Sequence, residues 1–441
     1  MALETSADLR KEIVALARRY QAGRLRKFIP GETTVQYSGS VMAEDEVQAL
    51  VEGVLDGWFG LAAKGRQFEE ALAKYLGVER SLYVNSGSSA NLIAVSTLCQ
   101  RMIHNRLKAG DEVVTPATTF PTTVFPLLQN GLVPVFVDSD PATLNAKPQL
   151  LEAAISEKTK LLMIPHTMGN PNDMDLVMGL VKEHNLHLIE DNCDALGSTF
   201  GGRKTATFGE LATTSFYPAH HITTGEGGAV FIPKGTQLYR TARSLRDWGR
   251  HCYCDTDEKD VLGACHARFS FKLDGVPYDH KYMYSTVGYN LKPTEIQAAL
   301  GVVQAKRIDE FGAARRRNFK VLYERFSKHQ DLFILPEKHK KADPSWFAFW
   351  ATVREKAPFS RNEFAAFLES KKIQTRVVFA GNLVKQPAMK FEKFRVHGTL
   401  EGADTIAART LFVGVYPGLT DEMLGYVGDC VDEFARTHRR S

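Results

Sequence analysis

Three short motifs contain side chains that could perform chemistry together. Residues 85–91 (NSGSSAN) follow an apolar run and open a helical pattern, and the N–H groups at a helix start, with small hydroxyls, can bind a phosphate. Asp191 ends another apolar run, where a carboxylate can keep the ring nitrogen of a cofactor protonated. His220 lies within a third motif, residues 215–228, and an imidazole transfers protons near neutral pH. Taken singly, each motif is also compatible with an ordinary turn, cap or packed loop.

Four of the six cysteines form a second candidate centre. Cys252, Cys254 and Cys265 lie in one segment, and Cys193 follows Asp191 by two residues. Four thiolates suit a tetrahedral zinc ion or an iron–sulfur cluster, and their spacing alone leaves a cluster, a zinc ion and free thiols open. A metal beside Asp191 would lie within electron-transfer distance of a cofactor held there, which favours a redox cluster over a structural zinc ion. We expect the other two cysteines to be buried structural thiols; they are Cys99 and Cys430.

Short apolar runs that end in polar residues must position these motifs. The runs alternate with helical patterns and cover residues 111–117, 134–140, 160–166 and 186–192. Such alternation predicts an α/β fold with a largely parallel sheet that helices cover on both faces. Ligands of these sheets bind beyond the carboxyl ends of the strands. We therefore expect the functional site at that edge, where the last of the four runs ends.

The length of 441 residues favours more than one domain. Residues 1–40 are predicted to be an N-terminal helical extension, because apolar residues recur there at helical spacing. Residues 41–300 carry the α/β pattern and are predicted to form a large cofactor-binding domain, followed by a smaller α+β domain at residues 301–441. Residues 247–290 contain three cysteines and many aromatic residues without a clear period. We interpret them as a functional insertion in the large domain.

The composition argues against several classes of function. A net charge of +4 is too weak to favour nucleic acid. The triplet Arg315-Arg316-Arg317 lies in a helical pattern, and we interpret it as a solvated helix face rather than a phosphate site. No window approaches the roughly 18 apolar residues of a membrane span, and the N-terminus lacks the apolar core of a signal peptide. We expect a cytoplasmic protein without a membrane or nucleic-acid partner.

The motif at residues 215–228 (SFYPAHHITTGEGG) resembles the cofactor-lysine loop of the DegT/DnrJ/EryC1/StrS sugar aminotransferases, which reads Ser-Phe-x-x-x-Lys-x-Ile-x-x-Gly-Glu-Gly-Gly. The resemblance extends over about residues 36–430 and implies aminotransferase fold type I, with a large, mostly parallel sheet domain and a smaller α+β domain. The one departure within the loop is His220 at the lysine position. An imidazole has no primary amine and cannot form a Schiff base with pyridoxal phosphate. The resemblance therefore implies a pyridoxamine phosphate held by non-covalent contacts, with His220 as a general base.

The resemblance also implies roles for individual residues. The ring of bound pyridoxamine 5′-phosphate would stack on Phe120, with Asp191 at the ring nitrogen. Asn290 resembles the residue that reaches the phosphate of the neighbouring subunit, which implies a homodimer. Asp194 and Tyr217 are expected to flank the site, and Asp194 stands where transaminating relatives carry Gln or His, so we expect it to help exclude transamination. The residues expected to contact the phosphate are Gly87, Ser88, Ser89 and Ser215.

The combination of His220 with four cysteines resembles the hexulose 3-dehydrases of deoxysugar biosynthesis, known from the ascarylose pathway and from O-antigen gene clusters. Those enzymes hold a [2Fe–2S] cluster, which implies Cys193, Cys252, Cys254 and Cys265 as its ligands. The interval before Cys265 is a few residues longer here. The implied reaction removes the C3 hydroxyl of a nucleotide-linked 4-keto-6-deoxyhexose, with CDP as the favoured nucleotide. A separate reductase, either an iron–sulfur flavoprotein or a ferredoxin, would supply electrons through the cluster.

Two alternatives remain open at this point. A cluster-free 3-dehydrase of the same family would use the same histidine and regenerate its cofactor with glutamate. A degenerate aminotransferase fold could instead serve as a zinc-stabilised binding or regulatory protein. The clustered cysteines argue against the first alternative. The intact phosphate motif and Asp191 argue against the second, because an inactive site need not retain them.

Overall fold

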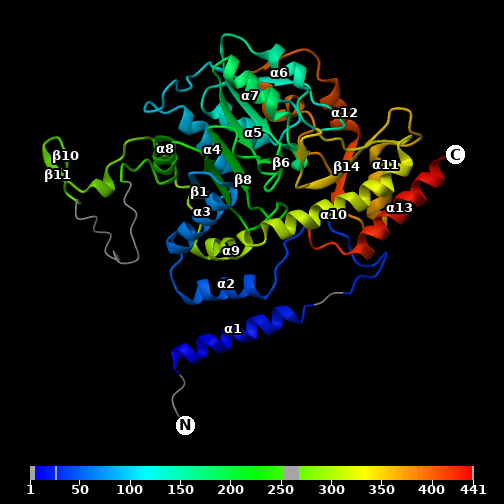
Figure 1. The fold of residues 1–441 in the computed structure, drawn as a ribbon, viewed down its shortest axis with the longest axis horizontal. Coiled ribbons are helices and arrows are strands. Elements are labelled where there is room, and N and C mark those ends of the chain that lie inside the picture. The colour runs from blue at the N-terminus through cyan, green and yellow to red at the C-terminus, as the bar shows by residue number, and fades with distance from the viewer. Residues whose placement is uncertain (1–4, 25–26, 253–267, 440–441) are drawn as a thin grey trace.

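An eight-stranded sheet forms the centre of the computed structural model, which describes residues 5–24, 27–252 and 268–439 (Figure 1). Its strand order is β1-β9-β8-β5-β4-β2-β3-β16, and all pairings from β8 to β16 are parallel. Only β9 runs antiparallel to its two neighbours. The expected α/β fold with a mostly parallel sheet is thus confirmed. The strands are β1 (Arg80–Val84), β2 (Glu112–Pro116), β3 (Val133–Val137), β4 (Thr159–Pro165), β5 (His187–Asp191), β8 (Leu211–Ser215), β9 (Gly228–Ile232) and β16 (Arg395–Val396).

Successive side chains of a strand point to opposite faces of the sheet. Since the strands are apolar on both faces, helices cover both of them. In β2, Val113 packs into one buried cluster and Val114 into another. The first face is covered by α4 (Gly87–Leu98), α5 (Pro121–Gln129) and α8 (Thr236–Arg246). The opposite face is covered by α6 (Pro148–Ala154) and α7 (Met174–Glu183) over the middle strands, and by α3 (Ala63–Leu76) and α9 (Glu295–Ala305) over β1, β8 and β9.

A smaller antiparallel sheet follows in the last third of the chain. Its order is β12-β14-β17-β15, with β12 (Phe333–Ile334), β14 (Ala348–Val353), β15 (Arg376–Val377) and β17 (Thr410–Gly414). Four helices accompany it: α10 (Ile308–Phe326), α11 (Arg361–Ser370), α12 (Glu401–Arg409) and α13 (Asp421–Arg439). A capping box opens α11: Ser360 Oγ accepts from the N–H of Glu363, and Glu363 Oε2 accepts from the N–H of Ser360. Two successive helices, α9 and α10, lead from the large sheet into this smaller one.

The two sheets are linked by pairings between distant segments. A three-stranded sheet joins β13 (Ala342–Asp343) to β6 (Thr199–Phe200) and β7 (Arg203–Lys204). From the same C-terminal part of the chain, β16 extends the large sheet beside β3. Segments beyond residue 300 therefore contribute to the cores of both sheets. The domain boundaries at residues 40, 300 and 441 stay predictions.

Two peripheral segments lie away from the sheets. The expected N-terminal helix forms as α1 (Ser6–Ala22), which contacts α2 (Glu44–Leu55) but buries none of its own residues. Within residues 247–290, the described part includes the exposed hairpin of β10 (Phe271–Leu273) and β11 (Val276–Tyr278), which projects from the molecule (Figure 1). Within the described residues, no helix combines the length and apolar character that a bilayer crossing requires. Short 3₁₀ turns are η1 (Thr167–Gly169), η2 (His280–Tyr282), η3 (Ser327–His329), η4 (Leu383–Lys385) and η5 (Pro387–Phe391).

Candidate active site

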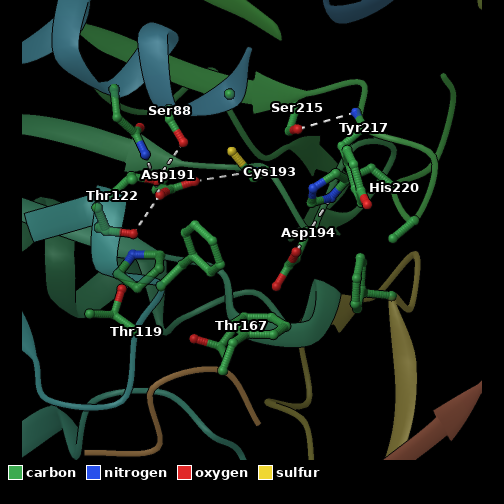
Figure 2. A pocket seen from close by; sticks show the side chains of 18 of the residues that line it. Ser88, Thr119, Thr122, Thr167, Asp191, Cys193, Asp194, Ser215, Tyr217 and His220 are labelled. Atoms are coloured by element: carbon green, nitrogen blue, oxygen red, sulfur yellow. Dashed lines mark hydrogen bonds and ion pairs between the residues drawn. The ribbon is translucent and has the colours of Figure 1, made fainter. Parts of the chain in front are cut away.

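A pocket of about 430 Å³ lies at the carboxyl ends of the parallel strands (Figure 2). Asp191 at the end of β5 and Ser215 at the end of β8 line it, together with Pro165 at the end of β4. The smaller sheet contributes its other wall, through β15 and β17. The site therefore lies where the sequence predicts it. Of the expected site residues, the pocket collects Gly87, Ser88, Phe120, Asp191, Cys193, Asp194, Ser215, Tyr217 and His220.

The start of α4 forms one side of the pocket and packs tightly against β8 and β9. Ser86 caps the helix by accepting from the N–H of Ser89 at 3.0 Å. A Cβ on Gly87 would lie 2.5 Å from the Cβ of Ser215, and a Cβ on Gly228 would lie 2.4 Å from the carbonyl oxygen of Ser86. The glycines thus let the first turn of α4 approach Ser215 closely. Ser89 serves the cap and does not line the pocket, unlike the other three expected phosphate contacts.

Asp191 is held in place by side chains from two helices. Its Oδ2 accepts from Asn91 Nδ2 at 2.8 Å and from Thr123 Oγ1 at 2.7 Å, and its Oδ1 accepts from the N–H of Cys193 at 3.2 Å. The carboxylate is buried. Sequence reasoning missed Asn91 and Thr123 as supports of this carboxylate, although Asn91 lies within the motif at residues 85–91. Asn91 follows Gly87 by one helical turn, which places both on one face of α4.

His220 lies in the turn between β8 and β9, with its ring against the aromatic ring of Phe347 at 5.3 Å between centroids. Its Nδ1 is buried without a hydrogen bond and lies 3.5 Å from Asp194 Oδ1. Burial lowers the pKa of His220 to about 4, and the positive charge of Arg315 adds to the effect. The imidazole is therefore neutral at neutral pH and can accept a proton, and its contact with Asp194 is not an ion pair.

Asp194 has the opposite shift. Burial raises its pKa to about 7, and the nearby charge of Asp191 raises it further, while the N–H of Met168 donates to its Oδ2 at 3.2 Å. This carboxyl is therefore close to half-protonated at neutral pH. Asp194 and His220 form a pair of facing groups whose environments move their pKa values in opposite directions, as acid–base sites often do. The sequence offered no sign of this inversion, which depends on burial.

Aromatic side chains form the remaining wall. Phe120 is half-exposed in the pocket and packs edge-on against Phe379, at 5.7 Å between ring centroids. Tyr217 is also half-exposed, with its N–H donating to Ser215 Oγ. Among the described residues that line the pocket, Arg376 is the single arginine or lysine, and its guanidinium lies 4.2 Å from the ring centre of Tyr37. Sequence reasoning did not assign Arg376 or Tyr37.

The proposed metal ligands are only partly described. Cys193 lines the pocket, and burial followed by the charge of Asp191 raises the pKa of its thiol. Cys252 is half-buried in the segment after α8, and Cys254 and Cys265 lie outside the described residues. Within the described part of the chain, no three His, Cys, Asp or Glu side chains gather as a metal site. The four-cysteine cluster is therefore not shown.

Three further expectations have different outcomes. Asn290 is exposed and bridges to Asp247, so a single chain does not bring it to its own pocket.

Cys430 is buried as expected, whereas Cys99 is only half-buried. The interpretation of the arginine triplet as a solvated face is wrong for Arg315, which is fully buried and donates to backbone carbonyls, including that of His220.

The pocket fits pyridoxamine phosphate. The first turn of α4 and Ser215 form a cradle that a Cβ at Gly87 would fill, and such N–H groups bind phosphate. Asp191 also lines the pocket and presents a buried carboxylate that could meet a ring nitrogen, and Phe120 offers an aromatic face. His220, which lines the same pocket, carries no primary amine. The chemistry of these donors therefore matches a cofactor held without a covalent bond.

Comparisons with known proteins agree with this geometry. Residues 41–432 match the DegT/DnrJ/EryC1/StrS aminotransferase family. The chain is 46% identical over 437 residues to dTDP-4-dehydro-2,6-dideoxy-D-glucose 3-dehydratase of Saccharopolyspora spinosa, covering 98% of this chain and 94% of that one. It is also 46% identical over 435 residues to the lipopolysaccharide biosynthesis protein RfbH of Salmonella typhimurium, covering 98% and 99% of the two chains.

Solved structures show the same likeness. The structure of GDP-4-keto-6-deoxy-D-mannose-3-dehydratase from E. coli, with bound hydrated PLP, superposes with a TM-score of 0.81 at 27% identity. The superposition covers 90% of this chain and 98% of that one. The match of the family over residues 41–432, together with the relatives at 46% identity, establishes that this chain belongs to the DegT/DnrJ/EryC1/StrS aminotransferase family.

Proposed function

We propose that this protein removes the C3 hydroxyl of a nucleotide-linked 4-keto-6-deoxyhexose, using pyridoxamine 5′-phosphate held by non-covalent contacts. The observation that carries the proposal is His220, a neutral imidazole in the pocket at the position of the family's cofactor lysine. A relative at 46% identity is named as a sugar 3-dehydratase, and another as a lipopolysaccharide biosynthesis protein. Both names support a role in deoxysugar biosynthesis.

The residues around the pocket have separable roles in this proposal. Bound pyridoxamine phosphate would supply a primary amine for the sugar ketone and a ring that withdraws electrons. Gly87, Ser88 and Ser215 would hold its phosphate, Phe120 would cover a ring face, and Asp191 would bind the ring nitrogen. Asn91 and Thr123 keep the Asp191 carboxylate oriented by donating to its Oδ2.

Proton transfer falls to His220. Its buried Nδ1 faces Asp194, which leaves Nε2 as the nitrogen that can exchange a proton with a group in the pocket. Because the imidazole is neutral at neutral pH, it can accept that proton without first losing one. Asp194, with a pKa of about 7, can then stabilise the charged imidazole from the Nδ1 side. The ring of Phe347 packs on the imidazole and that of Phe379 on Phe347, and both rings line the pocket.

Replacing the base tests this proposal. His220→Asn keeps the size of the side chain but cannot accept a proton, so we expect C3 dehydration to fall by about 10²–10⁴-fold while pyridoxamine phosphate still binds. His220→Lys restores a primary amine, and we expect pyridoxal phosphate to become attached covalently, as borohydride trapping and mass spectrometry would detect. His184→Asn, at an exposed helix end, is the control. Full dehydration activity in His220→Asn would show that the base is another group.

The substrate is proposed to be CDP-linked, and the proposal includes Arg376 as a contact for its diphosphate. Arg376 supports this because it is the single described arginine or lysine in the pocket wall, and its guanidinium suits bidentate contact with phosphate. The test compares kcat/KM for CDP-, dTDP- and GDP-linked 4-keto-6-deoxyhexoses. A preference for either of the other two nucleotides would contradict the proposed specificity.

We further propose a [2Fe–2S] cluster on Cys193, Cys252, Cys254 and Cys265, reduced by a separate iron–sulfur flavoprotein or ferredoxin. The support is the sequence pattern and the position of Cys193 beside Asp191. Protein purified without air should be brown and contain iron and sulfide, and Cys193→Ser should lose both, whereas Cys99→Ser should retain them. Colourless protein that turns over with glutamate would favour the cluster-free alternative. Stoichiometric zinc without dehydration would favour the non-catalytic alternative.

A homodimer completes the proposal. Asn290 is exposed and outside its own pocket, which suits a role in the pocket of a second copy. Apolar side chains are exposed on α1 and α2 and in the loop after α2, including Leu16, Trp58 and Phe59. Such a surface on a protein of this size is typical of an interface.

A further inference from the structure

The guanidinium of Arg376 in the pocket wall has few partners within its own chain. Arg376 lies on β15, the edge strand of the smaller sheet, and both residues of this strand are exposed. Its Nη1 donates to the carbonyl oxygen of Thr375 at 2.7 Å, and no carboxylate of the described residues forms an ion pair with it. A guanidinium has five N–H donors, so most of those of Arg376 remain available to a ligand.

An arginine in such a setting needs something that fixes its direction. A long exposed side chain samples many rotamers, and a ligand that orders it must offset the lost entropy. An acid beside the guanidinium would fix it, but the acid would also neutralise the charge that an anionic ligand requires. An aromatic face orients a cation and leaves its charge and its N–H donors free.

Tyr37 provides that face. The carbon at the centre of the Arg376 guanidinium lies 4.2 Å from the centre of the Tyr37 ring. A cation within about 6 Å of such a centre is attracted by the partial negative charge of the ring face. The same ring meets Phe412 edge-on, at 6.1 Å between centroids. All three side chains line the pocket.

The backbone that carries Tyr37 is anchored to the smaller sheet. The N–H of Val35 donates to the carbonyl oxygen of Lys372 at 2.8 Å, and the N–H of Gln374 donates to that of Val35 at 2.9 Å. The N–H of Tyr37 itself donates to Gln374 Oε1 at 3.4 Å. A Cβ on Gly414, at the end of β17, would lie 2.5 Å from the carbonyl oxygen of Tyr37. The chain therefore passes directly over this strand end, which fixes where the ring lies.

We propose that Tyr37 is a positioning residue that orients the guanidinium of Arg376 through a cation–π contact, so that the N-terminal segment of the chain completes the binding site for the substrate's diphosphate. This inference rests on the proposed role of Arg376. It gives a function to a segment that the sequence assigns to an extension outside the cofactor-binding domain. Tyr37 lies more than three hundred residues before Arg376 in the chain.

Three substitutions at position 37 separate the ring face from the hydroxyl and from simple filling of space. Tyr37→Phe keeps the face and loses the hydroxyl, whereas Tyr37→Leu keeps an apolar side chain and loses the face. Tyr37→trifluorophenylalanine keeps the shape of the ring and weakens the negative charge of its face. Phe208→Leu is the matched control, because Phe208 lies outside the pocket and makes an equal contact of 4.2 Å with the exposed Arg203.

The main measurement is the Kd of a nucleoside diphosphate, from calorimetric titration of the full chain loaded with pyridoxamine phosphate. CDP, dTDP and GDP are titrated in turn, and the one that the parent protein binds most tightly is used for the variants. The same variants are compared by their KM and kcat for the matching nucleotide-linked 4-keto-6-deoxyhexose. The Kd for pyridoxamine phosphate and the temperature of unfolding report on the rest of the fold.

The positioning role predicts a specific pattern. In Tyr37→Leu the nucleotide Kd and the KM should rise by about three- to tenfold, while kcat and the Kd for pyridoxamine phosphate stay unchanged. The trifluorinated variant should shift in the same direction, whereas Tyr37→Phe and Phe208→Leu should match the parent protein. Arg376→Gln should raise the nucleotide Kd by at least about tenfold. Adding Tyr37→Leu to Arg376→Gln should then change it by less than about twofold, because the two residues act as one unit.

Several outcomes would overturn the inference. An unchanged nucleotide Kd in Tyr37→Leu, or in the trifluorinated variant if Tyr37→Leu does not fold, would exclude the cation–π contact. A rise in Tyr37→Phe as large as in Tyr37→Leu would mean that the hydroxyl contacts the ligand instead. Full additivity in the double variant would mean that Tyr37 acts independently of Arg376. The proposed role of Arg376 fails by a different result, namely an unchanged Kd in Arg376→Gln, and the proposed dehydration fails through full activity in His220→Asn.

Discussion

At the scale of single residues, the imidazole of His220 and the carboxyl of Asp194 lie 3.5 Å apart with their usual order of basicity reversed. The pKa of His220 falls to about 4 and that of Asp194 rises to about 7. Burial is the first cause for both groups, because it disfavours the charged form of each. At neutral pH the proton of this pair therefore resides on the carboxyl more than on the ring. When Asp194 is ionised, a substrate proton can move to the ring, and the carboxylate then balances the positive charge of the imidazolium.

The Asp194 shift makes a prediction for stability. The folded pKa of about 7 lies above the ordinary value of 3.8 for the unfolded chain, so the folded state binds more protons between these values and is destabilised as pH rises through them. Asp194→Asn removes this cost, and its stability relative to the parent should improve by up to about 3 kcal/mol between pH 5 and pH 8. Thermal unfolding of the cofactor-free protein at both pH values measures it.

The stability measurement on Asp194→Asn must also account for the titration of His220, and it needs a control variant. His220 has a folded pKa below the ordinary value of 6.5, so it destabilises the fold as pH falls from about 6.5 to about 4. Its contribution is present in both proteins compared. Asp175→Asn is the control, because Asp175 is exposed and bonds Lys341 at the surface. A gain for Asp194→Asn that is equal at both pH values would mean that this carboxyl is ionised in the fold already at pH 5.

At the scale of elements, the start of α4 decides whether a phosphate can be held. The helix begins at Gly87 and is capped by Ser86. Its first turn packs against β8 and β9 so closely that Gly87 and Gly228 could not carry a Cβ without a clash. Gly87 and Ser88 of that turn line the pocket, where the N–H groups and the partial positive charge of a helix start can bind a phosphate. Close packing of three elements thus creates the cradle.

Filling this contact should weaken cofactor binding. In Gly228→Ala, the new Cβ would lie 2.4 Å from the carbonyl oxygen of Ser86 and 2.6 Å from the nitrogen of Gly87, and backbone atoms cannot rotate away. We expect the start of α4 to move from Ser215 and the Kd for pyridoxamine phosphate to rise at least about tenfold, a loss of about 1.4 kcal/mol. Gly179→Ala in α7 meets nothing within 4 Å and should leave the Kd unchanged, as calorimetric titration would show. An unchanged Kd in a folded Gly228→Ala protein would contradict the cradle.

At the scale of the whole molecule, the surface near α1 and α2 is unusual. α1 buries none of its residues, although its apolar side chains Leu9, Ile13 and Leu16 line up at helical spacing and stay exposed. Trp58 and Phe59, just after α2, are exposed as well. α1 contacts the rest of the chain mainly through α2. Because most helices in proteins are stabilised by packing of their apolar face, we expect the exposed apolar face of α1 to pack against another surface. A second copy of the chain would provide that packing.

The resulting prediction concerns mass in solution. Two chains of 49.1 kDa give a dimer of about 98 kDa, which sedimentation equilibrium should detect for the full chain. Replacing Trp58 and Phe59 together by serine should shift the protein toward the monomer, because the exposed rings lose their buried partners. Phe391→Ser, at an exposed position on η5, should not. A single species of 49.1 kDa for the unsubstituted protein would contradict the homodimer.

Much of the fold could be predicted because the patterns that determine it lie in residues adjacent in the sequence. The runs that became β2, β3, β4 and β5 are apolar and short, and their alternation with helices predicts a parallel sheet. The capping box at Ser360 and the position of Asp191 at a strand end are likewise properties of adjacent residues. One interpretation was wrong where the local pattern carries no information. The helical pattern around Arg315 does not show which face of the helix is buried, and Arg315 lies inside the protein.

By itself, the sequence determined the strand ends, the phosphate motif and the replacement of a lysine by His220, since residue type and spacing are enough for these. Only the tertiary structure decided that Asn91 and Thr123 hold Asp191, that Asp194 faces His220, and that Arg315 is buried. A residue's neighbours on a helix are rotated from it by about 100°, so three consecutive arginines point in different directions. Which one turns inward depends on how α10 packs against β14 and the His220 turn, and that packing joins segments far apart in the chain.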